Sequence, residues 1–207
     1  MTSIPPSQSP KSSRKKKKLS LRKSITLVGV ILGIPGSIAA LLSIPECKEI
    51  LFPSMKEYSD KDYGFQLKYP KDWQPIKKDP TLTGVVAEFT PPKDKSSTSC
   101  QASIIVGYSE PQRIMSLDQY TNSVIIPEIK TDFPNIQLPF PTAENLAQRN
   151  ANQVIYSGQL DGCNWQKLEI WTLDKIKAYR ITYQAEISDY PKFEKTAKEM
   201  IKTFELR

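Results

Sequence analysis

Hydrophobic and polar residues alternate along several segments of the chain, and this alternation predicts β-strands. The first clear case is Phe65, Leu67 and Tyr69, which alternate with polar residues at positions 66 and 68. A period of two places one set of side chains on the buried face of a sheet. Asp161-Gly162 is a strong hairpin signal between two later strands. The predicted strands cover residues 65–69, a short segment that opens at Trp73, 84–90, 102–108, 152–160, 165–173 and 178–187.

Two other segments have the spacing of amphipathic helices. One begins at Ser116, a favoured N-cap residue, and places its apolar positions on one side. The other begins near Asp189 and carries Pro191 in its first turn, where proline is tolerated. Its apolar residues recur three or four positions apart and predict one buried stripe. The stripe consists of Phe193, Ala197, Met200, Ile201 and Phe204.

A long apolar segment near the N-terminus predicts a transmembrane helix. Residues 24–44 contain no charged side chain, and as a helix they would span about 31 Å, close to the hydrocarbon thickness of a bilayer. A cleaved signal peptide is the alternative, with an apolar core at 25–34 and small residues at 37–39 before the cut. The residues expected to contact lipid are Ile25, Leu27, Val28, Val30, Ile31, Leu32, Ile34, Leu41 and Leu42.

The positive charge of the chain is concentrated before this segment. The formal net charge is +7, yet the residues after position 45 carry about −1, because the basic excess lies in the first 23 residues. We therefore expect residues 1–23 to be a disordered cytoplasmic tail and the part after a 45–57 linker to be exported to the periplasm or lumen. A neutral folded part argues against nucleic-acid binding. The side chains expected to contact anionic lipid headgroups are Arg14, Lys15, Lys16, Lys17, Lys18, Arg22 and Lys23.

Two short motifs resemble a known family. The run from Tyr63 to Trp73 (YGFQLKYPKDW) is similar to the opening of PsbP-like domains, and the run from Met200 to Glu205 (MIKTFE) is similar to their end. The resemblance covers about residues 58–207. It implies an α+β fold with an antiparallel β-sheet sandwiched between helices, on an exported, membrane-associated protein. In cyanobacteria and plastids such domains include an extrinsic photosystem II subunit and many relatives of unknown role.

Candidate chemistry is sparse, and we expect no enzyme activity and no cofactor. The chain has no histidine, which removes Ser-His and Cys-His catalysis and histidine metal sites, including the histidines that bind metal in photosystem II PsbP proteins. Asp60 and Asp62 precede Gly64 as in part of a calcium loop, but the spacing fits a solvated turn better. The strand carboxylates show no pairing signature of an acid–base pair. They are Glu88, Asp161 and Glu169.

The cysteines and the aromatic residues each allow two interpretations. Cys47, Cys100 and Cys163 are too widely spaced for a CxxC motif. Free buried thiols are the simpler interpretation, and a Cys100–Cys163 disulfide is the alternative in an oxidising compartment. Aromatic residues in the last three strands could line a binding surface, although core packing explains them better. They are Tyr156, Trp165, Trp171, Tyr179 and Tyr183.

Together these patterns predict a membrane-anchored, non-enzymatic binding or assembly module, with a photosystem II role as one version. Its partners would be membrane lipids, through the tail and the anchor, and an unidentified protein that binds the exported domain. The alternative is a carrier of a small ligand or lipid, with a pocket between the sheet and a helix. No nucleic acid is expected among the partners.

Overall fold

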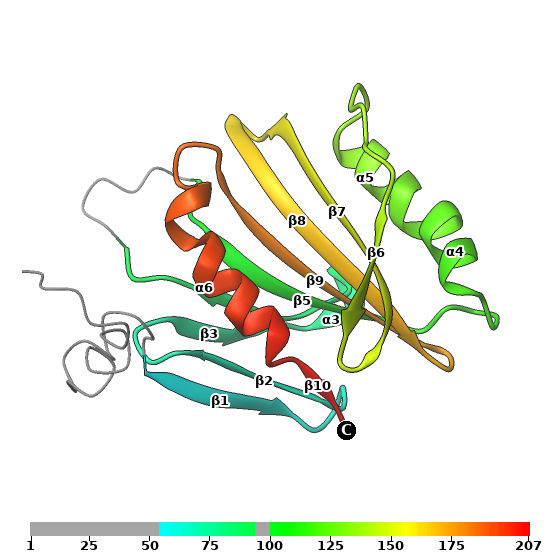
Figure 1. Ribbon diagram of the computed structural model, residues 1–207, viewed down its shortest axis with the longest axis horizontal. Coiled ribbons are helices and arrows are strands. Elements are labelled where there is room, and N and C mark those ends of the chain that lie inside the picture. Colours follow the sequence, from blue (N-terminus) through cyan, green and yellow to red (C-terminus); the bar gives the residue numbers. More distant parts are fainter. Residues whose placement is uncertain (1–53, 94–99) are drawn as a thin grey trace, which may run out of the picture.

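The computed structural model describes residues 54–93 and 100–207, which form two antiparallel sheets and a few helices (Figure 1). The larger sheet has seven strands in the order β3-β4-β5-β9-β8-β7-β6. Three of its neighbouring strands, β7, β8 and β9, are joined by tight turns at 161–162 and 175–176, and the sequence predicts the first of these turns. The strands are β3 (Gln74–Lys77), β4 (Val85–Thr90), β5 (Ser103–Ser109), β6 (Thr142–Leu146), β7 (Arg149–Leu160), β8 (Cys163–Asp174) and β9 (Lys177–Glu186).

The smaller sheet joins the start and the end of the described fold. It contains β1 (Met55–Asp60), β2 (Phe65–Pro70) and β10 (Glu205–Leu206) in the order β1-β2-β10. Gly64 closes the β1–β2 turn with a positive φ of 68°, a conformation that glycine adopts without strain. The Gly64 carbonyl accepts a hydrogen bond of 2.8 Å from the Arg207 amide. Glu205 pairs with Gln66, so the two sequence motifs at 63–73 and 200–205 meet in space.

Helices cover both faces of the larger sheet (Figure 1). The helix α6 (Tyr190–Lys202) packs on one face together with the smaller sheet. A continuous helical segment lies over β7 and β8 on the other face. It consists of α4 (Leu117–Tyr120), the π-helical turn η1 (Thr121–Ile125) and α5 (Ile126–Asp132). A single turn, α3 (Pro80–Thr83), precedes β4.

Each face of the sheet has its own core, because neighbouring side chains along a strand point to opposite faces. Tyr179 and Tyr183 pack in the core under α6, where Phe65 stacks on Phe204 at 5.5 Å between ring centroids. Trp171, Tyr156 and their neighbours form the core under α4–α5. These two residues and the two β9 tyrosines are buried, as expected for core packing, whereas Trp165 is half-buried.

The structure confirms an antiparallel α+β fold and corrects several details. Residues 55–57 were expected to belong to the linker but form the start of β1, in which Met55 pairs with Pro70. There are two sheets and not one, because β1 and β10 both pair with β2. The last helix ends at Lys202, so Phe204 reaches the core from the chain that follows the helix.

The predictions for the N-terminal part fall on residues that the structure does not describe. The tail at 1–23, the helix at 24–44 and residues 45–53 of the linker lie outside the described ranges. Within residues 54–93 and 100–207, no helix combines the length and apolarity that crossing a bilayer requires. The membrane anchor therefore stays a prediction from the sequence.

Candidate binding cleft

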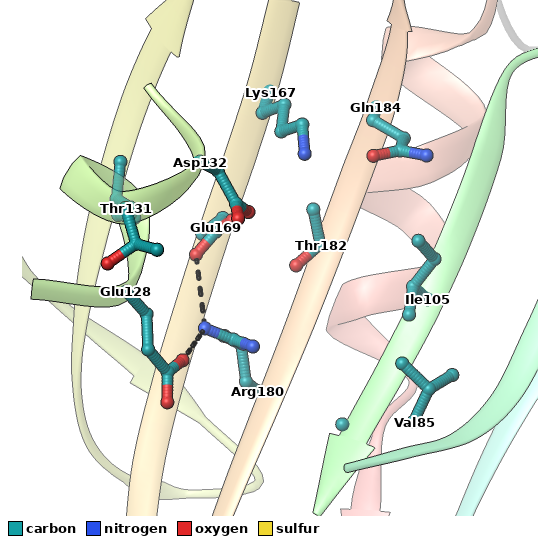
Figure 2. Close-up of a pocket in the computed structure, with 12 residues that line it drawn as sticks. Val85, Ile105, Glu128, Thr131, Asp132, Lys167, Glu169, Arg180, Thr182 and Gln184 are labelled. Carbon is teal, nitrogen blue, oxygen red and sulfur yellow. Dashed lines mark hydrogen bonds and ion pairs between the residues drawn. The ribbon is translucent and has the colours of Figure 1, made fainter. Parts of the chain in front are cut away.

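The face of the larger sheet that carries α5 is only partly covered and contains a cleft of about 340 Å³. The cleft lies between α5 and strands β5, β8 and β9 (Figure 2). Its floor is polar because every second residue of β8 and β9 faces it, while the residues between them pack in the core under α6. The polar residues that line it are Glu128, Thr131, Asp132, Lys167, Glu169, Arg180, Thr182 and Gln184.

Glu169 is a buried carboxylate at the floor of the cleft, with only 5% of its surface exposed. Its Oε1 atom accepts a hydrogen bond of 2.7 Å from the Tyr156 hydroxyl. Its Oε2 atom is buried and has no hydrogen-bond partner in the described part of the chain. The nearest cationic atom is Arg180 Nη1, at 3.9 Å. One carboxylate oxygen thus retains an unused capacity to accept a hydrogen bond.

Arg180 connects the sheet to α5. Its Nη1 atom donates a hydrogen bond of 2.7 Å to Glu128 Oε2. Burial alone would lower the pKa of Arg180, but the charges of Glu169 and Glu128 outweigh it, and the pKa is raised. Arg180 therefore stays charged and serves as the counter-ion that holds Glu128 at the edge of the cleft.

Lys167 places an ammonium group in the same cleft, two residues before Glu169 on β8. The residue is 8% exposed, and Nζ lies 5.2 Å from the centroid of the Phe133 ring. No hydrogen bond or close ion pair joins Nζ to another group among the described residues. Burial lowers the pKa of Lys167, against the opposite effect of Glu169 and Asp132. The ammonium is thus held by a cation–π contact and longer-range charge alone.

Two neutral side chains on β9 complete the polar floor. Thr182 is buried and Gln184 is half-buried, and Figure 2 shows both beside Lys167 and Glu169. Neither side chain has a hydrogen-bond partner within the described residues. The cleft therefore combines unpaired donors, unpaired acceptors and charges of both signs within one small volume.

Of the residues that line this cleft, only Glu169 was a candidate for chemistry on the basis of the sequence. Glu169 was considered as a strand carboxylate without a pairing signature, whereas the fold places it near Glu128 and Arg180. The other two strand carboxylates lie elsewhere: Glu88 forms an ion pair of 3.0 Å with Lys78, and Asp161 lies in the β7–β8 turn. Two charged residues within the apolar strand 165–173 are the signal that could have indicated a polar site.

The turn at Asp60 and Asp62 has its own internal contacts. Asp60 Oδ1 accepts hydrogen bonds from the backbone amides of Asp62 and Tyr63. Asp62 Oδ2 lies 2.7 Å from Lys77 Nζ. Among the described residues, no group of three or more His, Cys, Asp or Glu is arranged to hold a metal ion.

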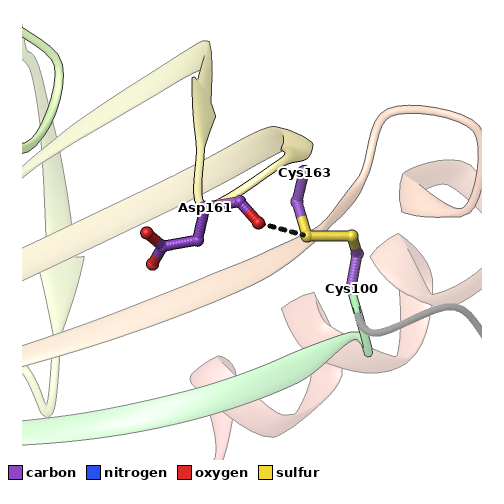
Figure 3. The surroundings of a disulfide bond; sticks show 3 residues. All are labelled: Cys100, Asp161 and Cys163. Atoms are coloured by element: carbon purple, nitrogen blue, oxygen red, sulfur yellow. Dashed lines mark hydrogen bonds between the residues drawn. A yellow bond between two sulfur atoms is a disulfide. The ribbon is translucent and has the colours of Figure 1, made fainter.

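Cys100 and Cys163 form a disulfide in the structure, with their Cα atoms 5.7 Å apart. The bond joins the segment before β5 to the start of β8 (Figure 3). The Asp161 carbonyl of the β7–β8 turn lies 3.9 Å from Cys163 Sγ. Of the two interpretations of these cysteines, the structure contains the bridged one, and Cys47 lies outside the described residues.

Comparisons with known proteins agree on the fold. A family model described as PsbP-like protein matches residues 49–206. The solution structure of cyanobacterial PsbP (CyanoP) from Synechocystis sp. PCC 6803 is 13% identical and has a TM-score of 0.57, and the match covers 75% of this chain and 94% of that one.

The crystal structure of LpqN, described as involved in cell envelope biogenesis of Mycobacterium tuberculosis, is 12% identical, with a TM-score of 0.56. That match covers 76% of this chain and 94% of LpqN. No curated protein matches the chain. At these identities the two structures show a shared fold and nothing about a shared ligand.

Proposed function

This chain belongs to the family of PsbP-like proteins, and from that premise we propose that it is a membrane-tethered, non-enzymatic binding or assembly module that recognises its partner through the cleft. The apolar segment 24–44 and the basic residues before it support a tether with the folded domain in the periplasm or thylakoid lumen. The lack of histidine and of any nucleophile motif supports a role without catalysis.

The observation that carries the proposal is the unpaired Oε2 atom of Glu169. A buried polar atom without a hydrogen bond costs about 1–3 kcal/mol of stability. A bound group that donates a hydrogen bond to this oxygen would remove that cost. Lys167 and Thr182 lie in the same cleft with unused hydrogen-bonding capacity, so the cleft is better suited to binding than to stabilising the fold.

A pull-down with the full-length chain from solubilised membranes tests this proposal. The variant Gln184→Trp places a large ring in the cleft, and Gln159→Trp is the matched control on an exposed position of β7. We expect a protein partner to be recovered with the wild type and the control and to be lost with Gln184→Trp. Recovery of no partner above background, or equal recovery with Gln184→Trp, would contradict the proposal.

The identity of the captured protein separates two versions of this role. Recovery of photosystem subunits would favour the photosystem II version. Recovery of envelope proteins would favour an envelope role of the kind that the description of LpqN names for that protein.

A small-ligand carrier is the second candidate, and the position of the cleft favours it. The cleft lies between a helix and the sheet, and its volume of about 340 Å³ is within the range of small-molecule sites. Its charged floor suits a polar ligand and not a lipid chain, which would need an apolar lining. Mass spectrometry of compounds released from the purified full-length chain tests this candidate, and a polar compound lost in Gln184→Trp is the expected result.

A further inference from the structure

We propose that the cleft binds a small zwitterion, with its ammonium group at Glu169 and Asp132 and its carboxylate or phosphate group at Lys167. This inference rests on the cleft being the recognition site of the proposed function. It goes further by assigning the ligand a chemical class from the charges that line the cleft.

The Glu169 side defines the position of a hydrogen-bond donor. The Tyr156 hydroxyl already donates a hydrogen bond to Glu169 Oε1. Glu169 Oε2 has no hydrogen-bond donor among the described residues, and Glu169 is more than nine-tenths buried. A buried carboxylate oxygen is best satisfied by a charged donor, because charge-assisted hydrogen bonds are the stronger ones. Asp132 at the exposed rim adds a second negative charge on the same side of the cleft. An ammonium group matches both features.

The Lys167 side defines the position of an anionic acceptor. Its ammonium group has three donor hydrogens and no hydrogen-bond acceptor among the described residues. Lys167 and Glu169 emerge on the same face of β8, with their Cα atoms about 7 Å apart. Figure 2 shows both side chains at the same open space, with Thr182 and Gln184 beside them. A ligand whose two opposite charges are a few bonds apart can reach both residues.

The charge balance of the cleft argues against a ligand of one sign. Arg180 donates its hydrogen bond to Glu128 at 2.7 Å and lies 3.9 Å from Glu169, beyond hydrogen-bond distance. The charged groups of the cleft that a ligand can still bond to directly are therefore Lys167, Glu169 and Asp132. A simple anion would meet two carboxylates, and a simple cation would leave Lys167 without an acceptor. A zwitterion satisfies both sides and leaves neither buried charge unpaired.

Calorimetry on the purified full-length chain tests the inference with four probes. Glycine and phosphoethanolamine carry both charges, whereas methylammonium and acetate carry one each. We expect at least one zwitterion to bind about tenfold or more tightly than either singly charged probe. Glycine binding indicates a free amino acid as the ligand. Phosphoethanolamine binding together with recruitment to phosphatidylethanolamine vesicles indicates a lipid headgroup, and both outcomes support the inference.

Two variants connect the binding to the assigned residues. Glu169→Gln removes the charge but keeps an oxygen that accepts the Tyr156 hydrogen bond, and Lys167→Met removes the ammonium group but keeps an unbranched apolar side chain one atom shorter. The matched controls are Glu199→Gln and Lys202→Met, which alter an exposed ion pair on α6. We expect each cleft variant to weaken zwitterion binding about tenfold or more and each control to leave it unchanged, with thermal unfolding confirming that all four variants are folded.

Three results would overturn the inference: no heat with either zwitterion, equal affinity for a singly charged probe, or unchanged affinity in both cleft variants. If one of these results occurs while a protein partner is still lost with Gln184→Trp in the pull-down, the zwitterion assignment is wrong and the proposed binding module stands. If neither a partner nor a ligand of the wild type is lost in Gln184→Trp, the proposed function itself is wrong.

Discussion

Lys167, Glu169 and Arg180 lie in β8 and β9, two neighbouring inner strands of the larger sheet, where most other buried side chains are apolar. Their neighbours Leu168, Ile170 and Ile181 face the core under α6. The same strands therefore have one face that packs under α6 and one face that holds these charges beside the core under α4–α5. Buried charges of this kind cost stability unless a partner compensates them, so the two faces have different effects on the folding free energy.

The cost of burying Lys167 gives a pH-dependent prediction for Lys167→Met. We expect this variant to raise the free energy of unfolding by about 1 kcal/mol at neutral pH, because it removes a buried ammonium that lacks hydrogen bonds. Burial lowers the pKa of Lys167 below the usual 10.5. The unfolded chain therefore binds this proton more tightly than the folded one, and the wild type regains stability as the pH rises from the lowered pKa towards 10.5.

The difference in the free energy of unfolding between Lys167→Met and the wild type should therefore be largest at neutral pH and vanish at alkaline pH. Urea unfolding of wild type and variant at both pH values measures it, and the difference between the two proteins cancels the titration of the shared tyrosines. Lys202→Met, at an exposed position on α6, is the control with no expected pH dependence. A variant that is less stable at neutral pH would contradict the prediction.

At this scale the sequence predicts which residues are polar but not which of them meet. Glu128 and Arg180 are 52 positions apart, and their ion pair depends on α5 crossing β9. The Cys100–Cys163 bridge could be stated as an alternative because both residues adjoin predicted strands. Choosing between the alternatives required the Cα distance, which strand patterns do not supply.

The helical segment α4–η1–α5 is fixed to the sheet by buried hydrogen bonds as well as by apolar packing. Ser116 and Gln119 form a capping box at its start. Pro127 lacks an amide hydrogen, and the π-helical turn η1 directly precedes the helical turn that contains it. Thr121 Oγ1 in η1 accepts hydrogen bonds from Trp171 Nε1 at 2.8 Å and Asn152 Nδ2 at 3.1 Å.

Thr121→Val tests this connection between helix and sheet. The variant keeps the shape of the side chain but leaves two donors of β7 and β8 without an acceptor. We expect a loss of about 2–3 kcal/mol in the free energy of unfolding, measured by urea titration. Thr131→Val is the control, because Thr131 is exposed and bonds only to the Pro127 carbonyl, and its effect should stay below about 0.5 kcal/mol. Equal effects of the two variants would argue against the role of Thr121.

The disulfide gives a second prediction at the level of elements. It closes a loop of 63 residues between the segment before β5 and the start of β8. Chain-entropy arguments for this loop give about 4 kcal/mol of stabilisation. We therefore expect the double variant Cys100→Ser/Cys163→Ser to lose about this amount, and the reduced wild type to match it.

Urea unfolding with and without a reducing agent measures the effect of the disulfide. Cys47→Ser should unfold like the oxidised wild type, which makes it the control. A wild type whose stability does not change on reduction would contradict the prediction.

The elements that the sequence predicts are those with strong periodicity. β2, β8, β9 and α6 have long alternating or helical patterns, and the structure contains them close to the predicted ranges. β6 shows no such pattern, because Leu146 is its only buried residue. β10 has two residues and is too short to be recognised. The division into two sheets follows from pairing partners, which local patterns do not specify.

On the scale of the whole molecule, the two faces of the larger sheet are unequal. One face is sealed by α6 and the smaller sheet, whereas α4–η1–α5 covers part of the other and leaves the cleft beside it (Figure 1). The smaller sheet contains the strand by which the chain enters the described fold. The proposed tether is thus joined to an element packed on the face opposite the cleft, which leaves the cleft available to a partner.

Membrane fractionation tests the tether. We expect the full-length chain to stay in the membrane after an alkaline wash, because a single apolar helix inserts stably in a bilayer. Deletion of residues 24–44 should release the protein into the soluble fraction. External protease should digest the C-terminal domain in cells without an outer barrier and spare a tag on the N-terminus.

The matched control replaces Lys15–Lys18 by serine, which removes positive charge but keeps the apolar segment 24–44. This variant should remain in the membrane with a weaker preference for one orientation. N-terminal sequencing of the membrane fraction tests whether the anchor is retained. A mature chain that begins near Ala40 would contradict the anchor and favour a cleaved signal peptide.

The pairing of β1 with β2 determines how the fold would respond to mechanical load. The two strands form a hairpin whose open end is the Met55–Pro70 pair. A pull that lifts the chain before Met55 away from β2 loads that end first, so the hydrogen bonds would break one after another, as in unzipping. β10 would remain paired with β2, and Phe65 with Phe204, after β1 had peeled away. Under such a load the β1–β2 hairpin would open first, while the rest of the domain keeps its fold.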